Sequence, residues 1–136
     1  MNKTFILKND LAEIKRLTDI LCKLCEENNI GNKILCDVSL ALEEIFANIV
    51  HYAYEDNKEH LIKIHMKIRD NVFSLEIRDD GKPFNPLEIP LTNTKAPFEE
   101  RKIGGLGIHL VRNLIDELEY KQNKGDNILT MKVRLQ

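Results

Sequence analysis

The first half of the chain contains two different spacings of apolar residues. Residues 4–7 have the alternation of a short strand, and leucine and isoleucine then recur at intervals of three and four over residues 10–28 and 32–54. Asp10 and Glu13 have the spacing of a helix capping box at the start of the first helical pattern. The sequence therefore predicts a strand followed by two amphipathic helices.

Strand patterns dominate the second half of the chain. Apolar and polar residues alternate over residues 61–69 and 72–78, and an Asp-Asn turn separates the two runs, which predicts an antiparallel hairpin. A third helical pattern extends from about Ile108 to Leu118. Two further strand patterns follow, over about residues 118–122 and 127–135.

This order of elements predicts an α+β two-layer sandwich, with helices on one face of a mixed, mostly antiparallel sheet. Because domains of about 100 to 150 residues are the commonest size, we expect a single domain at residues 1–136. The periodicity disappears over residues 79–103, which contain all four prolines of the chain. A loop of this length in a small domain usually has a function.

Composition and charge narrow the classes of function. A net charge of −2 with scattered lysines provides no basic surface, so we expect no nucleic-acid partner. No apolar run approaches the roughly 20 residues that span a bilayer, and three cysteines form no disulfide framework. We therefore expect a cytoplasmic protein without a membrane partner. Cys22 and Cys25 form a C-x-x-C pair, which we interpret as packed thiols because no second pair accompanies it.

The second predicted helix carries a polar stripe. Asn48 and His51 lie within about 40° of Glu44 on a helical wheel, and the apolar residues of this helix lie on the opposite side. A carboxylate and an amide on such a stripe can hold a cation and a water molecule. The alternative is that these residues form the solvated face of a surface helix.

Asp79 and Gly81 directly follow the strand at residues 72–78. Asp79 shares the parity of the inward apolar residues of that strand, so we expect its side chain to point toward the helices. A carboxylate there can accept a hydrogen bond from an exocyclic amine such as that of adenine, and Gly81 would let a flat ring approach the backbone. The alternative is an ordinary Asp-Gly turn.

Glycines gather before the third predicted helix, in the run Gly104-Gly105-Leu106-Gly107. The backbone N–H groups and the positive dipole end at a helix start favour an anion such as phosphate. The run lacks the Gly-Lys-Ser/Thr ending of a P-loop, and the spacing of a dinucleotide fingerprint is absent. Taken alone, this run is weak evidence for a site.

In this order and at these separations, the three features resemble the GHKL ATPases, which have the Bergerat nucleotide-binding fold. Residues 44–54 resemble the N box of the anti-sigma-factor serine kinase branch. Residues 79–81 resemble the adenine-binding D-x-G motif of the family, and residues 104–111 resemble its second glycine box. The resemblance covers nearly the whole chain, and it implies ATP and Mg²⁺ as cofactors.

The resemblance also implies roles for individual residues. Glu44 would be the catalytic base and Asn48 the Mg²⁺ ligand, whereas Asp79 and Gly81 would hold adenine. Further nucleotide contacts would come from an ATP lid at about residues 82–104, from the glycine run and from the last strand. These contacts would be made by Thr94, Lys95, Arg101, Gly104, Gly105, Leu106, Gly107 and Thr130.

Two of these positions depart from the expected pattern. Thr130 would support the adenine through water, yet strand alternation puts it on the face opposite Leu129 and Met131 unless a bulge intervenes. Asn85 stands in the lid where the family more often has aspartate.

The activity that the resemblance implies is that of an anti-sigma-factor-like serine-protein kinase. Such a kinase phosphorylates a small antagonist protein, adding about −1.5 to −2 charges to its surface, and sequesters a regulatory partner such as a sigma factor. The branch also implies a homodimer. The outer side of the first helix around Arg16 is a candidate docking surface, or else simply a solvated face.

Two other functions compete with this interpretation. A non-catalytic regulator would bind ATP to gate its partner without phosphoryl transfer, and an intact Glu44 argues against it. A histidine kinase catalytic part or a gyrase-like ATPase is disfavoured, because 136 residues leave no room for a phosphoacceptor helix pair or a transducer domain.

Overall fold

The computed structural model describes residues 1–83, 85, 87 and 105–135. Helices and strands follow one another along this part of the chain in the order that the sequence predicts. The elements are β1 (Asn2–Lys8), α1 (Glu13–Glu27), α2 (Asn32–Tyr52), β2 (Leu61–Arg69), β3 (Val72–Asp79), α3 (Gly105–Leu114), β4 (Glu117–Asn123) and β5 (Asp126–Arg134).

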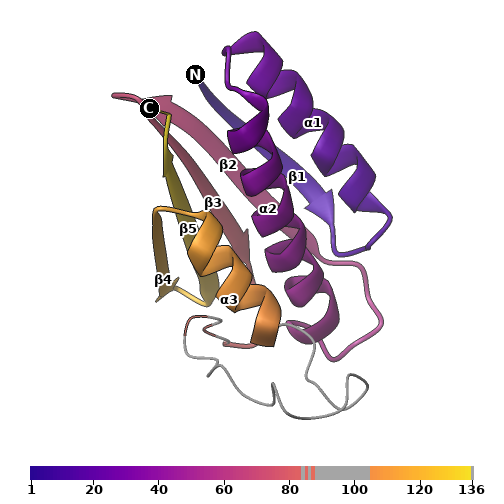
Figure 1. The fold of residues 1–136 in the computed structure, drawn as a ribbon. Coiled ribbons are helices and arrows are strands. Elements are labelled where there is room, and N and C mark those ends of the chain that lie inside the picture. Colours follow the sequence, from indigo (N-terminus) through magenta and orange to yellow (C-terminus); the bar gives the residue numbers. More distant parts are fainter. Residues whose placement is uncertain (84, 86, 88–104, 136) are drawn as a thin grey trace.

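The five strands form one sheet in the order β1-β2-β3-β5-β4. Every neighbouring pair among the described strands is antiparallel, so the expectation of a mixed sheet is wrong. The reason lies between β1 and β2, where α1 and α2 run as an antiparallel pair (Figure 1). The chain reverses direction three times between these strands, before α1, between α1 and α2, and before β2, so it enters β2 opposite to β1.

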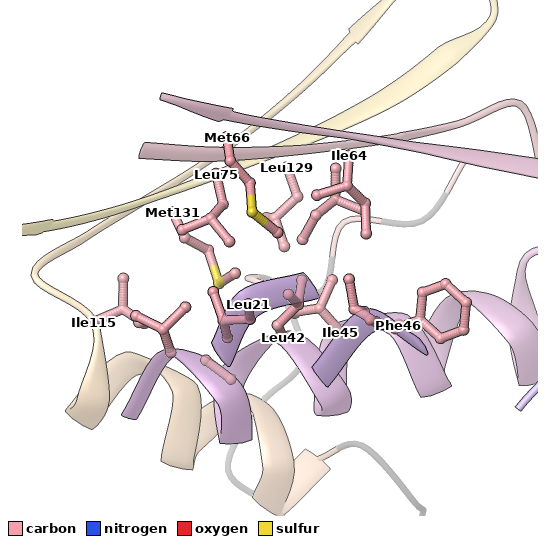
Figure 2. Close-up of a cluster of buried hydrophobic side chains, with 14 of the residues drawn as sticks. Leu21, Leu42, Ile45, Phe46, Ile64, Met66, Leu75, Ile115, Leu129 and Met131 are labelled. Carbon is pink, nitrogen blue, oxygen red and sulfur yellow. The ribbon is translucent and has the colours of Figure 1, made fainter. Parts of the chain in front are cut away.

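All three helices lie against the same face of the sheet, which confirms the two-layer sandwich (Figure 1). The core fills the space between the layers, where side chains of the helices meet those of the sheet (Figure 2). Leu21, Leu42, Ile45 and Phe46 come from α1 and α2, Ile115 follows α3, and Ile64, Met66, Leu75, Leu129 and Met131 come from the strands. This face of the sheet is the one that positions the candidate site.

The predicted hairpin of β2 and β3 is confirmed. Asp70 and Asn71 both have positive φ, at 52° and 65°, as a two-residue turn that matches the twist of the strands requires. The turn fixes the register, in which Ile68 pairs with Phe73. Phe73, Leu75 and Ile77 consequently face the helices, and so does the next residue of the same parity, Asp79.

Two details of the helices differ from the prediction. Asp10 and Glu13 do not form a capping box, because a turn precedes α1 and the helix begins only at Glu13. Asp10 Oδ1 accepts from Ala12 N at 2.9 Å, and Glu13 Oε2 accepts from Lys8 N at 2.9 Å. In addition, α3 ends at Leu114, and Leu118 belongs to β4.

The C-x-x-C pair lies within α1, where Cys25 is buried and Cys22 is exposed. Burial raises the pKa of the Cys25 thiol to about 11, so this side chain is a protonated core residue at neutral pH. No group of three or more metal-binding side chains occurs among the described residues. In the same ranges, no helix combines the length and the apolar character needed to cross a membrane.

Candidate active site

Asn48 is buried, although it belongs to the polar stripe of α2. Its side chain is 4% exposed, and neither Oδ1 nor Nδ2 has a hydrogen-bond partner among the described residues. The solvated-face interpretation is therefore wrong for Asn48, whereas it holds for His51, which is exposed. A buried amide without partners is destabilising, and such a group in a native protein calls for a ligand or another explanation.

Glu44 lies one helical turn before Asn48 and contacts the first turn of α3. A Cβ atom added to Gly107 would lie 1.9 Å from Glu44 Oε1, so the carboxylate occupies the space that any side chain at residue 107 would fill. Burial raises the pKa of the Glu44 carboxyl. The nearby Asn48 amide offsets part of this rise, although its geometry does not meet that of a hydrogen bond.

Asp79 is the buried carboxylate at the end of β3, and its predicted orientation toward the helices is confirmed. Oδ1 accepts hydrogen bonds from the backbone N–H of Gly81 at 2.9 Å and from Asn127 Nδ2 at 3.0 Å. Burial raises the pKa of this carboxyl, and the two hydrogen bonds oppose that rise. Both donors reach the same oxygen, so Oδ2 has no hydrogen-bond partner within the described part of the chain.

Gly81 is required for a reason that the sequence analysis did not identify. A Cβ atom at this residue would lie 2.4 Å from the carbonyl oxygen of Ala53, which follows α2. The next residue reinforces the contact, since Lys82 N donates to the same oxygen at 2.8 Å. The absent side chain therefore lets the loop after β3 pack on the end of α2, rather than leaving room for a flat ring.

Asn48 and Asp79 border one pocket, which α2, β3, β4, β5 and the loop after β3 surround. Its walls are mainly apolar, with a few polar groups at defined places, as is typical of small-molecule sites. The lining residues are Ile45, Asn48, Ile49, Ala53, Ile77, Asp79, Lys82, Tyr120, Asn127 and Leu129. The pocket therefore offers apolar walls and the Asp79 carboxylate as an acceptor to a ligand that presents a hydrogen-bond donor.

Two of the lining residues were missed by the sequence analysis. Asn127 on β5 is 6% exposed, and Tyr120 on β4 donates its O–H to Asn127 Oδ1 at 2.6 Å. A signal for Asn127 was present, because it shares strand parity with Leu129 and Met131 and is the one polar residue at the inward positions 127–133. A polar residue in such a series is buried and needs partners.

The assignment of Thr130 to the nucleotide is wrong. Thr130 pairs with Glu76 on β3 and with Glu119 on β4, and the register of both strand pairs is continuous through this residue. No bulge rotates the side chain, so Thr130 lies on the face of the sheet that the helices leave uncovered and does not line the pocket.

Several predicted contact residues lie outside the described residues, namely Thr94, Lys95, Arg101 and Gly104. Of the predicted lid at about residues 82–104, only residues 82, 83, 85 and 87 are described. Gly105 begins α3, which agrees with a helix start at the glycine run. Leu106 follows it in the first turn of that helix.

Comparisons with known proteins identify similar sequences. A family model described as a histidine kinase-like ATPase domain matches residues 7–133. An anti-sigma F factor of Caldanaerobacter subterraneus is 34% identical over 95 residues, which is 70% of this chain and 66% of that protein. The serine-protein kinase RsbW of Oceanobacillus iheyensis is 28% identical over 129 residues, which is 92% of this chain and 80% of that protein.

Among solved structures, one example is similar to this chain over almost its whole length. It contains the RsbU and RsbW domains of a Mycobacterium tuberculosis protein, with a TM-score of 0.72 at 14% identity. The match covers 98% of this chain and 32% of that one. At this identity, the likeness concerns the fold alone.

Proposed function

Because this chain belongs to the histidine kinase-like ATPase family, we propose that it binds ATP with Mg²⁺ and transfers a phosphoryl group to a serine of a protein partner. One observation carries this proposal: the amide of Asn48, which has no partner in the described part of the chain, borders the same pocket as the buried Asp79 carboxylate, and Glu44 lies one helical turn away against α3. The names of the two relatives, an anti-sigma F factor and a serine-protein kinase, support the choice of a protein substrate.

Asp79 supports adenine as the base. Two hydrogen bonds occupy its Oδ1, which leaves Oδ2 as the available acceptor of a residue that lines the pocket. An acceptor at this place pairs with the exocyclic amine of adenine, whereas guanine has a carbonyl oxygen at the equivalent position. The apolar walls from Ile45, Ile77 and Leu129 match the faces of a flat ring.

Asn48 supports a Mg²⁺ site. Mg²⁺ prefers oxygen ligands, and it is usually held by one or two protein side chains together with water and substrate phosphates. Asn48 Oδ1 is such an oxygen, and its lack of a partner among the described residues is explained if a ligand completes its coordination. When bound, the ion would neutralise charge on the phosphates.

Glu44 supports proton abstraction. Its pKa is raised by burial, which brings a carboxylate closer to the working pH of a general base. In the proposed reaction, Glu44 takes the proton of the serine hydroxyl as the serine oxygen bonds to the γ-phosphorus and ADP leaves. The start of α3, with Gly105, Leu106 and Gly107, would steady the phosphate charge through its backbone N–H groups.

The lid residues and the partners are part of the same proposal. Lys95 and Arg101, with Gly104, would contact the phosphates from the lid side. A small antagonist protein would be the phosphoryl acceptor, and a sigma factor the sequestered partner, with the chain acting as a cytoplasmic homodimer in transcription regulation. On α1, Arg16 is bonded to Glu13 and to the carbonyl oxygen of Ile6, which supports a fixed basic group on that surface.

The test is phosphoryl transfer with Glu44→Gln beside the wild type. Each protein is incubated with Mg²⁺ and γ-labelled ATP and a serine-containing antagonist protein from the same genome. We expect label on the acceptor with the wild type, and a loss of about 100-fold or more with Glu44→Gln at nearly unchanged ATP affinity. Glu43→Gln is the matched control, because Glu43 contacts Thr18 of α1 rather than α3.

Two outcomes would contradict the proposal. ATP binding by the wild type without transfer to any antagonist would favour the non-catalytic, ATP-gated regulator. Equal rates for Glu44→Gln and the wild type would remove Glu44 from the role of base.

A further inference from the structure

Asn127 is a buried polar residue near the start of β5, which lies between β3 and β4 in the sheet. Its amide takes part in five polar contacts within the described residues. Nδ2 donates to Asp79 Oδ1 at 3.0 Å, to Gly81 O at 3.2 Å and to Lys82 O at 3.1 Å. Oδ1 accepts from Tyr120 O–H at 2.6 Å and from Gln122 Nε2 at 3.4 Å.

The chemistry of these partners fixes the orientation of the amide. All three groups around Nδ2 are acceptors, and Tyr120 and Gln122 each present a donor to Oδ1. Exchanging the oxygen and nitrogen would place an amide oxygen against the three acceptors of Asp79, Gly81 and Lys82, and these contacts would have no donor. The two Nδ2 protons are already shared among three acceptors, so Asn127 has no donor left for a ligand.

Asn127 therefore acts on the pocket through Asp79. Its amide and the Gly81 N–H both saturate Oδ1, which leaves Oδ2 as the acceptor that the carboxylate can offer. The same amide ties the carbonyls of Gly81 and Lys82 to β5, while Lys82 N is tied to Ala53. The carboxylate and the loop behind it are thus held from two sides.

We infer that Asn127 is the positioning residue that gives this pocket its selectivity for an amino-substituted purine. Without its N–H donor, the Asp79 carboxylate can turn within the pocket, and Oδ2 no longer meets the exocyclic amine. This inference rests on the proposed binding of ATP. It assigns to Asn127 no contact with the nucleotide.

The experiment compares two nucleotides that differ only in the exocyclic amine. The dissociation constants of ATP and of purine riboside triphosphate, which has hydrogen in place of the amine, are measured by calorimetry with Mg²⁺. We expect the wild type to prefer ATP by about tenfold or more, since a hydrogen bond to a buried charged acceptor is among the stronger ones. In Asn127→Leu the preference should decrease to about twofold or less.

A purely structural role for Asn127 would weaken both nucleotides equally and leave this ratio unchanged. The matched control is Asn113→Leu, the same substitution at an exposed position of α3, which should keep the wild-type ratio. Tyr120→Phe removes the O–H that holds Asn127 Oδ1 and should give an intermediate ratio. It provides the decisive measurement if Asn127→Leu does not fold.

An unchanged ratio in Asn127→Leu overturns the inference, and so does an unchanged ratio in Tyr120→Phe where that variant decides. Both results leave the proposed ATP binding intact. A wild type that binds neither nucleotide overturns the proposed function itself, and the inference with it.

Discussion

Replacing Gly107 with alanine tests whether Glu44 works from its observed position. The new Cβ would lie 1.9 Å from Oε1, 2.1 Å from Cδ and 2.6 Å from Cγ of Glu44. Non-bonded heavy atoms are normally about 3.5 Å apart, so the carboxylate has to retreat by more than about 1 Å. The backbone need not follow, because the atoms in the way form the end of a long side chain.

The expected effect is large on the reaction and small on folding. A displacement of about 1 Å of a reacting group costs about 100-fold in rate, which corresponds to about 2.7 kcal/mol. Alanine is a better helix former than glycine by up to about 1 kcal/mol, which offsets the cost of moving Glu44. We therefore expect a transfer rate about 100-fold below that of the wild type, with ATP affinity within about threefold.

Single-turnover transfer of labelled phosphate measures the rate, and thermal unfolding followed by circular dichroism checks the fold. Gly31→Ala is the matched control, because no atom lies within 4 Å of the Cβ that it would add. A transfer rate for Gly107→Ala close to that of the wild type would refute the reasoning. Glu44 would then reach its working position only after moving away from α3.

Three further predictions concern the same pocket. Gly81→Ala should lower stability by about 2 kcal/mol or more and weaken ATP binding. The added Cβ would lie 2.4 Å from the backbone oxygen of Ala53, so the loop after β3 would have to move. Thermal unfolding and nucleotide titration measure the two effects. Asn48→Leu should raise stability by about 1 to 3 kcal/mol, because it removes a buried amide that has no partner among the described residues. It should also abolish the gain in ATP affinity that Mg²⁺ gives, which is measured with and without a chelator. The raised pKa of the buried Asp79 carboxyl means that the folded protein holds this proton more tightly than the unfolded chain, so stability decreases as the pH rises from the ordinary carboxyl value of about 3.9 through the raised pKa. Asp79→Asn should therefore unfold at a higher temperature than the wild type at pH 7, and this difference in unfolding temperature should vanish near pH 3.5. The ATP affinity of the variant should fall several-fold. A difference in unfolding temperature that stays constant across this pH range would contradict the raised pKa of Asp79.

The parts of the fold that depend on local patterns could be predicted from the sequence. Alternation in β2 and β3, with the Asp70-Asn71 turn between them, fixes which residues face the helices. The orientation of Asp79 follows from that parity alone, and it is the most reliable element of the predicted site. The same rule, applied to β5, counted against Thr130, and it would have placed Asn127 inward although this residue was not predicted to belong to the site.

The remaining features depend on contacts between elements that are distant in sequence. The helical wheel groups Glu44, Asn48 and His51, but it cannot show that tertiary packing buries Asn48 and leaves His51 exposed. The capping box at Asp10 failed for a similar reason, since Glu13 bonds to the backbone of β1 instead. The requirement for glycine at residue 81 could not be predicted, because Ala53 lies 28 positions earlier in the chain.

The position of β5 in the sheet determines which contacts a partly synthesised chain lacks. Although β5 is the last described strand along the chain, it lies between β3 and β4 in the sheet. On a ribosome, a nascent chain that ends at Gly125 has β4 without its only described partner and Asp79 without the donor of Asn127. Such an intermediate exposes the unpaired edge of β3 and part of the apolar core, which are the features that recruit chaperones. The pocket is consequently incomplete until β5 has paired, because Asn127 and Leu129 of this strand form part of its lining.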